Sequence, residues 1–383
     1  MTSTPYFTHP DVIVEASPNG AGLITLNRPG ALNALSLPMI RALTSVLRLW
    51  KDDDRMHAVA IRGKSKLGAF GAFCAGGDIR FFHQAATEGH AALDDFFTEE
   101  YALNHLIFTY PKPYIAFMDG VVMGGGMGIS QGGQCCIVTE RTKMAMPETL
   151  IGLFPDVGGG YFLSRTPGHV GEYLGLTGQV ISGAQAMLWG LADVHAPSDT
   201  LSRAWDALPH VHARHSLDFM KAWEAETAAL GWQTGTEAAL NRGAQPLAPE
   251  LEQAFASETV MQILQALQAA GSDTAIQTAH VLRQRSPLML HVVLEQIRRA
   301  RHMDLSDELR MERDLVRHCF HPAHLGRLPA VSETVEGIRA LVVDKDHTPR
   351  WVPDAVEAVR PEMVEPFFVS PWPAHQHPLR DLA

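Results

Sequence analysis

The first 200 residues alternate short apolar runs, many of them β-branched, with glycine-rich turns. Two runs, 12–16 and 21–26, flank a Ser-Pro-Asn-Gly turn and predict a pair of strands. Further strands are predicted in three later runs: 57–63, 113–118 and 135–138. Helical patterns separate these strands, which is typical of an α/β fold.

A helix is predicted between the second and third strands. Its apolar residues recur at spacings of three and four, as expected for one buried face: Ile40, Leu43, Leu47 and Trp50. Ser36 suits the N-cap position, and Pro38 suits the first turn. Beyond about residue 200 strand-like runs almost vanish. We therefore predict a core over 1–200 that carries the chemistry, and a mainly helical region over 201–383 that ends in an extended, proline-rich tail.

Charge and cysteine content narrow the classes of protein that the chain can represent. Its 383 residues carry a formal charge of −11, which disfavours binding to nucleic acid. No apolar run is long enough for a membrane span, and the N-terminus lacks the pattern of a secretory signal. The four cysteines include no CxxC pair, so we interpret them as reduced thiols. These features predict a cytoplasmic protein.

Three kinds of sequence pattern resemble functional motifs but lack a residue, a neighbouring element or a spacing that the motif requires. Residues 63–65 resemble the end of a phosphate-binding loop, but Ala58 stands where that motif requires glycine. Ser130 lies in a GxSxG pattern, yet glycines rather than a strand precede it, so we interpret it as a packing residue inside a helix. Two histidine clusters lack a metal-binding spacing, and we predict no metal site: His210, His212 and His215, and His318, His321 and His324.

Two glycine-rich turns are candidates for binding an oxyanion. Residues 73–79 form a tight turn that leads into a helix, and residues 118–128 form a strand, a glycine turn and a helix. Glycines at such positions expose backbone N–H groups and allow another atom to approach closely. Two turns that face each other would supply two donors to one oxygen atom. Taken alone, each cluster is also compatible with an ordinary tight turn.

Two carboxylates lie eight residues apart in an apolar stretch. Glu148 follows Met146-Pro147, and Asp156 precedes Val157-Gly158-Gly159-Gly160. Burial and a like-charged neighbour both raise the pKa of a carboxyl group, so such a pair can divide the roles of nucleophile, acid and base. An alternative interpretation is that Glu148 caps a helix and Asp156 closes a turn.

These segments, in this order, resemble the crotonase (enoyl-CoA hydratase/isomerase) superfamily. Residues 26–35 resemble its N-terminal signature. The longest matches resemble the 3-hydroxyisobutyryl-CoA hydrolase branch, and they fall at 123–126, 145–149, 152–162, 337–340 and 344–346. The resemblance covers most of the chain and is weakest over about 200–285.

The resemblance implies a crotonase-like spiral of ββα units, with two roughly perpendicular sheets and a helical C-terminal region. It implies an oxyanion hole formed by the backbone N–H groups of Gly77 and Gly125. It implies catalytic roles for Glu148 and Asp156, and substrate contacts from Glu100, Gly125 and both catalytic residues. It implies an acyl-CoA substrate, no separate cofactor and no metal, and it allows a homo-oligomer built on trimers.

One position separates the chemistries within this superfamily. Hydratases carry a glutamate two residues after the glycine triplet, where this chain has Gly128. The resemblance therefore implies hydrolysis of a short-chain 3-hydroxyacyl-CoA, namely 3-hydroxyisobutyryl-CoA in valine catabolism. An enoyl-CoA hydratase or isomerase is the first alternative. A non-catalytic RNA-binding or scaffold role is the second, which the negative charge disfavours.

Overall fold

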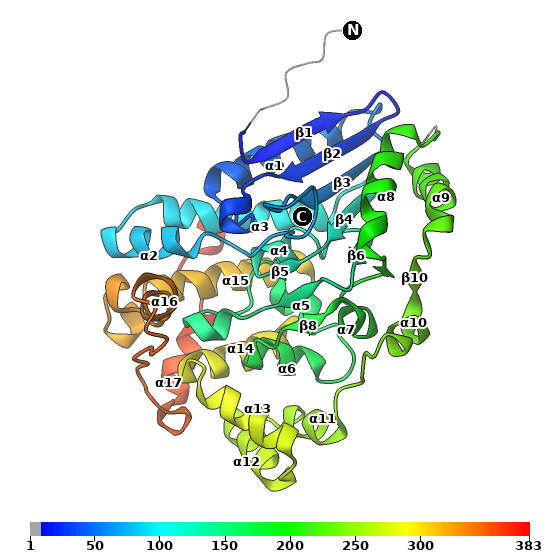
Figure 1. The fold of residues 1–383 in the computed structure, drawn as a ribbon. Coiled ribbons are helices and arrows are strands. Elements are labelled where there is room, and N and C mark those ends of the chain that lie inside the picture. The colour runs from blue at the N-terminus through cyan, green and yellow to red at the C-terminus, as the bar shows by residue number, and fades with distance from the viewer. Residues whose placement is uncertain (1–8, 214) are drawn as a thin grey trace. The chain divides into compact units, whose positions relative to one another are not determined.

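The computed structural model describes residues 9–213 and 215–383, which form two sheets and many helices (Figure 1). Contacts group the chain into two compact units, each of them discontinuous in sequence. Unit 1 comprises residues 1–77, 102–144 and 181–245, and unit 2 comprises residues 78–101, 145–180 and 246–383. Beyond residue 200 the described residues contain helices and one short strand, in agreement with the helical pattern. The division into domains at residue 200 stays a prediction.

A seven-stranded sheet, in the order β1-β2-β3-β4-β6-β9-β10, forms the centre of unit 1. Its inner strands pair in parallel, and the two edge pairs, β1–β2 and β9–β10, are antiparallel. The second sheet has the order β5-β7-β8. All five predicted strands are confirmed, with ends shifted by at most one residue. The strands are β1 (Val12–Ala16), β2 (Ala21–Leu26), β3 (Ala58–Gly63), β4 (Tyr114–Met118), β5 (Val121–Met123), β6 (Cys135–Val138), β7 (Lys143–Ala145), β8 (Ile181–Ser182), β9 (Val194–His195) and β10 (Gln233–Thr234).

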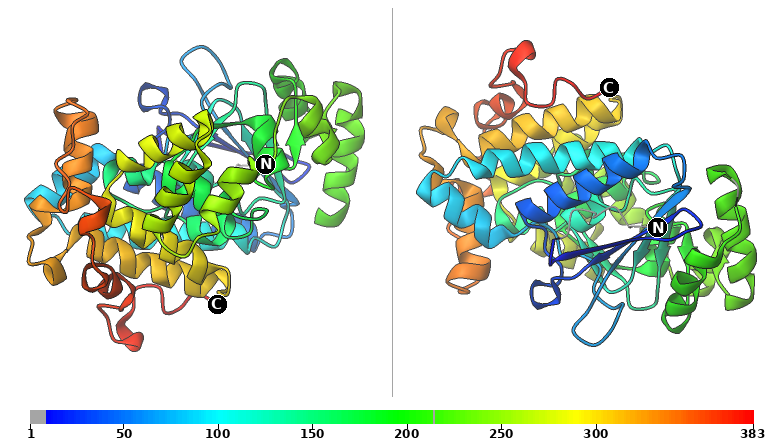
Figure 2. Two further views of the ribbon diagram at one scale, coloured as in Figure 1. Left: turned by 90° about the horizontal axis from the view of Figure 1, so that it is seen from below. Right: turned by 90° about the horizontal axis from the view of Figure 1, so that it is seen from above.

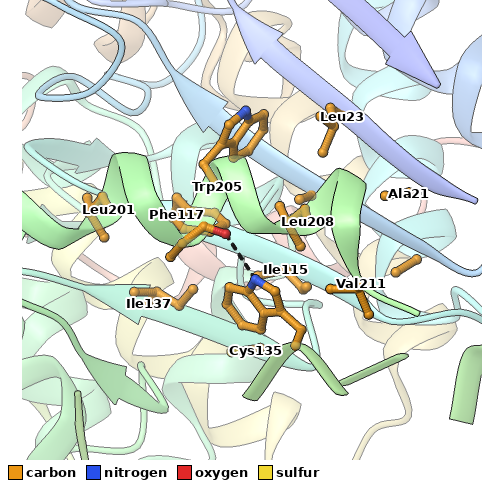
Figure 3. Packing of buried hydrophobic residues seen from close by; sticks show 14 of the residues in the cluster. Ala21, Leu23, Ile115, Phe117, Cys135, Ile137, Leu201, Trp205, Leu208 and Val211 are labelled. Carbon is orange, nitrogen blue, oxygen red and sulfur yellow. Dashed lines mark hydrogen bonds between the residues drawn. The ribbon is translucent and has the colours of Figure 1, made fainter. Parts of the chain in front are cut away.

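Helices cover both faces of the seven-stranded sheet, which explains why its strands are apolar on both sides. On one face, apolar side chains of β2, β4 and β6 pack against Leu201, Trp205 and Leu208, which belong to α8 (Leu201–Ala207) and the turn after it (Figure 3). On the other face, α1 (Leu37–Lys51) brings Trp50 so close to Gly22 that a Cβ there would lie 2.5 Å from the indole ring. The predicted apolar face of α1 is buried and Ser36 is its N-cap, as the sequence indicated.

The remaining helices of unit 1 flank these sheets. They are α4 (Gly125–Gly128), α7 (Gly183–Leu188), α9 (Ser216–Thr227) and α10 (Gly235–Asn241). Ser130 corrects one prediction: it lies two residues beyond the end of α4, not inside a helix. Its hydroxyl is fully buried and donates to the carbonyl oxygen of Gly126 at 2.8 Å, so it does serve as a packing residue.

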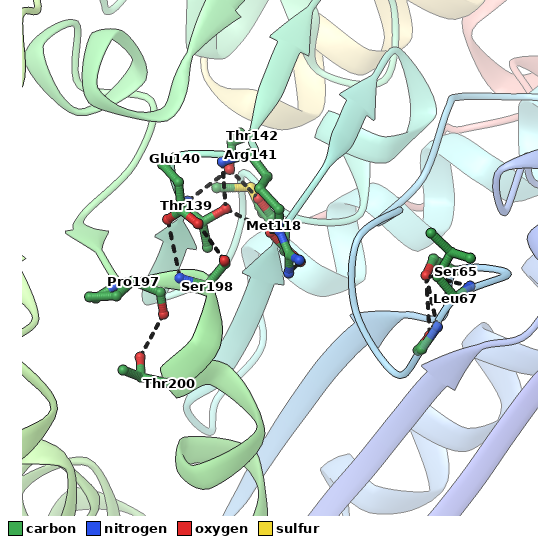
Figure 4. A network of polar contacts seen from close by, with 12 residues as sticks. Ser65, Leu67, Met118, Thr139, Glu140, Arg141, Thr142, Pro197, Ser198 and Thr200 are labelled. Atoms are coloured by element: carbon green, nitrogen blue, oxygen red, sulfur yellow. Dashed lines mark hydrogen bonds and ion pairs between the residues drawn. The ribbon is translucent and has the colours of Figure 1, made fainter.

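A polar network fastens the end of β4, from which the chain enters β5. Buried Asp119 follows β4 directly, pairs with Arg141 and accepts a 2.6 Å hydrogen bond from Thr139 (Figure 4). Thr142 donates to the Met118 carbonyl at 2.7 Å. These bonds join the 139–142 turn to the chain that leads towards the glycine triplet.

Unit 2 is mostly helical. Helix α11 packs on α12, α12 packs on α13, and α14 packs on α6 (Figure 2). Helix α3 (Ala92–Phe108) contributes its first ten residues to this unit. The other helices are α2 (Ile79–Glu88), α5 (Gly159–Leu163), α6 (Val170–Thr177), α11 (Pro249–Phe255), α12 (Val260–Ala270), α13 (Asp273–Arg283), α14 (Pro287–Ala300), α15 (Leu305–Phe320), α16 (Glu333–Ile338) and α17 (Pro361–Val364).

The C-terminal tail differs from the predicted extended path. It forms short helical turns over Pro361–Val364, Glu365–Phe368 and Ala374–Gln376. Phe367 and Leu379 are buried, which explains why this proline-rich segment adopts a defined path. Within residues 9–213 and 215–383, none of the helices has the length and apolar character needed to cross a bilayer.

Candidate active site

The two predicted glycine turns lie side by side within unit 1. The segment around Cys74 pairs with β5: the Cys74 N–H donates to the Val121 carbonyl at 2.9 Å, and the Met123 N–H donates to the Cys74 carbonyl at 3.0 Å. Gly126 permits this approach, because a Cβ there would lie 2.3 Å from the Cys74 carbonyl oxygen. Gly76 adopts φ +102°, a conformation that L side chains rarely adopt.

The N-terminal signature holds the first of these turns. The side-chain amide of buried Asn33 donates to the carbonyl oxygens of Ala72 at 2.7 Å and Phe73 at 3.2 Å. The Leu35 N–H donates to the Gly76 carbonyl at 2.8 Å. This is the structural reason for the signature, and it assigns Asn33 a supporting role that the sequence motif alone did not reveal.

The two N–H groups that the resemblance implied are both available as donors. In the described part of the chain, neither the Gly77 nor the Gly125 N–H donates a hydrogen bond. A Cβ on Gly76 would lie 3.6 Å from the Gly125 nitrogen, so the turn that ends at Gly77 reaches the start of α4. Two unpaired backbone donors in adjacent turns can bind one carbonyl oxygen.

The three predicted carboxylates all belong to unit 2, and all are buried. Glu100 lies in α3 and is 2% exposed, whereas Glu148 and Asp156 are each 6% exposed. Glu148 begins the short helix Glu148–Ile151, and Asp156 lies in the turn that leads to α5. One oxygen of Glu100 and one of Glu148 have no hydrogen-bond partner among the described residues.

Burial and mutual repulsion set the charge of these groups. Burial raises the pKa of Glu100 well above its usual range, and the charges of Asp156 and Glu148 raise it further. Burial, followed by the charge of Asp156, also raises the pKa of Glu148. Burial raises the pKa of Asp156 to about 7. No arginine or lysine among the described residues offsets these shifts, so Asp156, with a pKa of about 7, can hold or release a proton near neutral pH.

Tyr101 is a fourth member of this carboxyl set. Its hydroxyl donates to Asp156 Oδ2 at 3.0 Å, and burial keeps its pKa well above the usual value, so it remains a donor. An aromatic cluster fixes the helix that carries it: Phe97 packs between Tyr101 and Phe320 of α15, at centroid distances of 6.1 and 5.4 Å. The sequence placed Tyr101 next to Glu100 but did not signal this contact.

The C-terminal helices hold the turns that carry Glu148 and Asp156. Gly337 of α16 lies so close that a Cβ there would be 2.4 Å from the backbone of Ile151, the last residue of the short helix that Glu148 begins. Thr334 donates to the Gly152 carbonyl at 2.7 Å. The motif at 337–340 thus has a packing role beneath the Glu148 turn.

The basic side chains near the two glycine turns have surroundings unlike those of the buried carboxyls. Lys64 and Lys66 are exposed on the loop after β3, where Ser65 and Leu67 are seen in Figure 4. Arg28 donates to the Ala34 carbonyl at 2.9 Å. Among the described residues no group of three histidine, cysteine, aspartate or glutamate side chains could hold a metal ion.

The fold and these motifs define a member of a known enzyme family. The family model described as Enoyl-CoA hydratase/isomerase matches residues 21–368, so the chain belongs to that family.

Two groups of relatives are similar over almost the whole chain. Proteins named 3-hydroxyisobutyryl-CoA hydrolase, mitochondrial, are 38% identical over 356 residues in Xenopus laevis and 36% identical over 355 residues in Homo sapiens. Each match covers 91% of this chain and 86% of the relative. The solved carnitinyl-CoA dehydratase of Mycobacterium thermoresistibile has a TM-score of 0.81 at 34% identity, covering 97% of this chain and 99% of its own. An enoyl-CoA hydratase of Rhodobacter sphaeroides has a TM-score of 0.78 at 32% identity, covering 94% and 98%.

Proposed function

We propose that this protein hydrolyses a short-chain 3-hydroxyacyl-CoA, with 3-hydroxyisobutyryl-CoA of valine breakdown as the preferred substrate. The observation that carries this proposal is the buried set of Glu100, Glu148 and Asp156, in which Asp156, with a pKa of about 7, can hold or release a proton near neutral pH. The named hydrolases at 36–38% identity support the same reaction.

The backbone donors of unit 1 stabilise the developing charge in this mechanism. The acyl oxygen accepts hydrogen bonds from the N–H groups of Gly77 and Gly125. These hydrogen bonds become stronger as the carbonyl becomes a tetrahedral oxyanion. Each donor contributes about 2.7–4 kcal/mol of transition-state stabilisation. The mechanism requires that the carbonyl bound there come within reach of the carboxyl set.

The carboxyl groups carry the bond-making steps. Ionised Glu148 attacks the acyl carbon to form a mixed anhydride, or it takes a proton from an attacking water molecule. Protonated Asp156 gives its proton to the departing CoA sulfur and takes one back from water, so the products are the free hydroxy acid and CoA. Glu100 hydrogen-bonds the substrate hydroxyl. In isotopically labelled water under single-turnover conditions, label found in Glu148 would establish the anhydride route.

Hydration of an enoyl-CoA is a second candidate, favoured by the names of the two similar structures. Gly128 stands against it, because hydration needs a second carboxylate at that position of the superfamily pattern. Purified protein is tested for thiol release from 3-hydroxyisobutyryl-CoA and for hydration of crotonyl-CoA, with Glu148→Gln as the control for contaminating enzymes. Faster hydration than thiol release would refute the proposed hydrolysis.

We propose that the reaction needs no metal or redox cofactor, since CoA enters as part of the substrate. All four cysteines are free and buried, which fits a reducing compartment. We propose the cytoplasm, whereas the curated relatives are named mitochondrial. Cell fractionation tests this location, and sedimentation velocity tests the trimer that the family resemblance implies.

A further inference from the structure

The turn that carries Asp156 contains a strained residue. Val157 adopts φ +59° and is 1% exposed, and Gly158 follows it with φ +84°. A β-branched residue in the left-handed region is a genuine outlier and stores backbone strain. Such a conformation persists only where neighbouring groups hold it in place.

A carboxyl group from α15 holds this turn. Glu312 is fully buried, and its Oε2 accepts from the Gly158 N–H at 2.8 Å while its Oε1 accepts from the Gly160 N–H at 3.1 Å. Gln296 of α14 donates to the Pro155 carbonyl at 2.7 Å and to Glu312 Oε1 at 3.2 Å. The backbone is therefore anchored on both sides of Asp156.

A second buried glutamate lies beside this anchor. Glu308 lies one helical turn before Glu312 and is fully buried. Burial raises the pKa of Glu308 to about 7. Burial and the charge of Glu308 raise the pKa of Glu312 well above its usual range, whereas the hydrogen bond from the Gly158 N–H lowers it. The anchor itself consists of the three N–H groups that point at Glu312, from Gly158, Gly160 and Gln296.

We propose that Glu312 is a positioning residue for Asp156: its carboxylate holds the strained 156–160 turn and so orients the Asp156 carboxyl. The inference rests on the proposed function, because Glu312 acts on the reaction only through Asp156. The motif around Asp156 does not supply this anchor, since Glu312 lies 156 residues further along the chain.

The charge of Glu312 also reaches Asp156. The charge of Asp156 raises the pKa of Glu312, and the same repulsion acts in the reverse direction. Arg165 faces Glu308 and lowers the pKa of that group. The groups that face Asp156 are Glu100 and Tyr101 of α3, Glu148, and Glu312 and Cys319 of α15.

Glu312→Gln and Glu308→Gln form a matched pair for the test. The amide of Glu312→Gln keeps one acceptor but turns an NH₂ group towards a backbone N–H, so it loses part of the anchor. The amide of Glu308→Gln keeps the volume beside Glu312 and leaves the bonds from Gly158 and Gly160 to Glu312 in place. For Glu312→Gln we expect kcat to fall about 10²-fold with KM within about threefold, since misplacement of a reacting group has an effect of that size.

Hydrogen exchange supplies a readout that does not depend on activity. The peptide covering 155–163 should exchange faster in Glu312→Gln and at the wild-type rate in Glu308→Gln. If Glu312→Gln does not fold, Gln296→Met removes the donor to Pro155 and should shift exchange and kcat in the same direction, by less. Unchanged exchange in this peptide together with an unchanged kcat would overturn the inference. Absence of thiol release in the wild type refutes the proposed function instead, and exchange still shows whether Glu312 holds the turn.

Discussion

Replacing Asp156 with asparagine should stabilise the protein at neutral and alkaline pH while it lowers activity. Burial raises the folded-state pKa of Asp156 to about 7, above its ordinary value of 3.8. Between these two values the folded state binds more protons than the unfolded state. Stability is therefore fully present at low pH and is lost as the pH rises through the folded-state pKa. Asparagine does not titrate and still accepts the hydrogen bond from Tyr101.

The size of the effect follows from the difference between the two pKa values. A change from 3.8 to about 7 corresponds to about 4 kcal/mol of unfolding free energy lost by the wild type between about pH 4 and about pH 8. The charge of Asp156 also raises the pKa values of Glu100, Glu148 and Glu312, so its removal acts on these groups in the same, stabilising direction. Asp156→Asn should match the wild type near pH 4 and exceed its stability by up to about 4 kcal/mol near pH 8.

Chemical denaturation at a series of pH values measures the difference in unfolding free energy between the two proteins. The thiol-release assay measures the loss of activity. We expect kcat to fall about 10²–10⁴-fold with little change in KM, because the amide keeps the shape of the side chain but carries no proton. The pH–rate profile should lose one limb. Parallel stability curves for the two proteins would refute the reasoning that Asp156 is a buried, destabilising carboxyl. An unchanged kcat with a raised KM would make Asp156 a binding residue, with Glu100 as the next candidate for the acid.

Three further predictions address the other parts of the site. Glu148→Gln should lower kcat at least about 10²-fold in the thiol-release assay, and activity near that of the wild type would remove Glu148 from the mechanism. Tyr101→Phe removes a hydrogen bond that lowers the pKa of Asp156, so the corresponding pH limb should move to higher pH; no movement would show that this bond does not stabilise the ionised form. Gly126→Ala would place a Cβ 2.3 Å from a carbonyl oxygen and should cost about 1–3 kcal/mol by calorimetry, whereas Gly30→Ala, with no atom within 4 Å, should cost nothing.

Elements that depend on local pattern were predictable from the sequence. The strands at 12–16 and 21–26 and the buried face of α1 follow from apolar spacing, because a buried face repeats with the period of its element. The position of Ser130 relative to α4 could not be predicted in this way. Its position beyond α4 depends on where the helix of glycines ends, and glycine carries no side-chain pattern to indicate that point.

Only those buried carboxyl residues that lie in recognisable sequence motifs could be predicted from the sequence. Glu100, Glu148 and Asp156 could be named from the family resemblance, and the structure shows that all three are buried in unit 2. Glu308 and Glu312 were not predictable. On an amphipathic helix such as α15, a glutamate is ordinarily assigned to the solvent face, yet these two lie four residues apart on the buried face.

The C-terminal helices therefore hold the turns of unit 2 that carry Glu148 and Asp156. Gly337 packs beneath the helix that Glu148 begins, and Glu312 holds the turn that carries Asp156. Neither contact lies in the segment that contains the proposed catalytic residues. A chain that keeps every residue of the central motifs but loses α15 and α16 would retain the chemical groups without the geometry that fixes them. Helices α15 and α16 thus help to keep buried, mutually repelling carboxyls in place, since an unsupported turn would relax towards solvent.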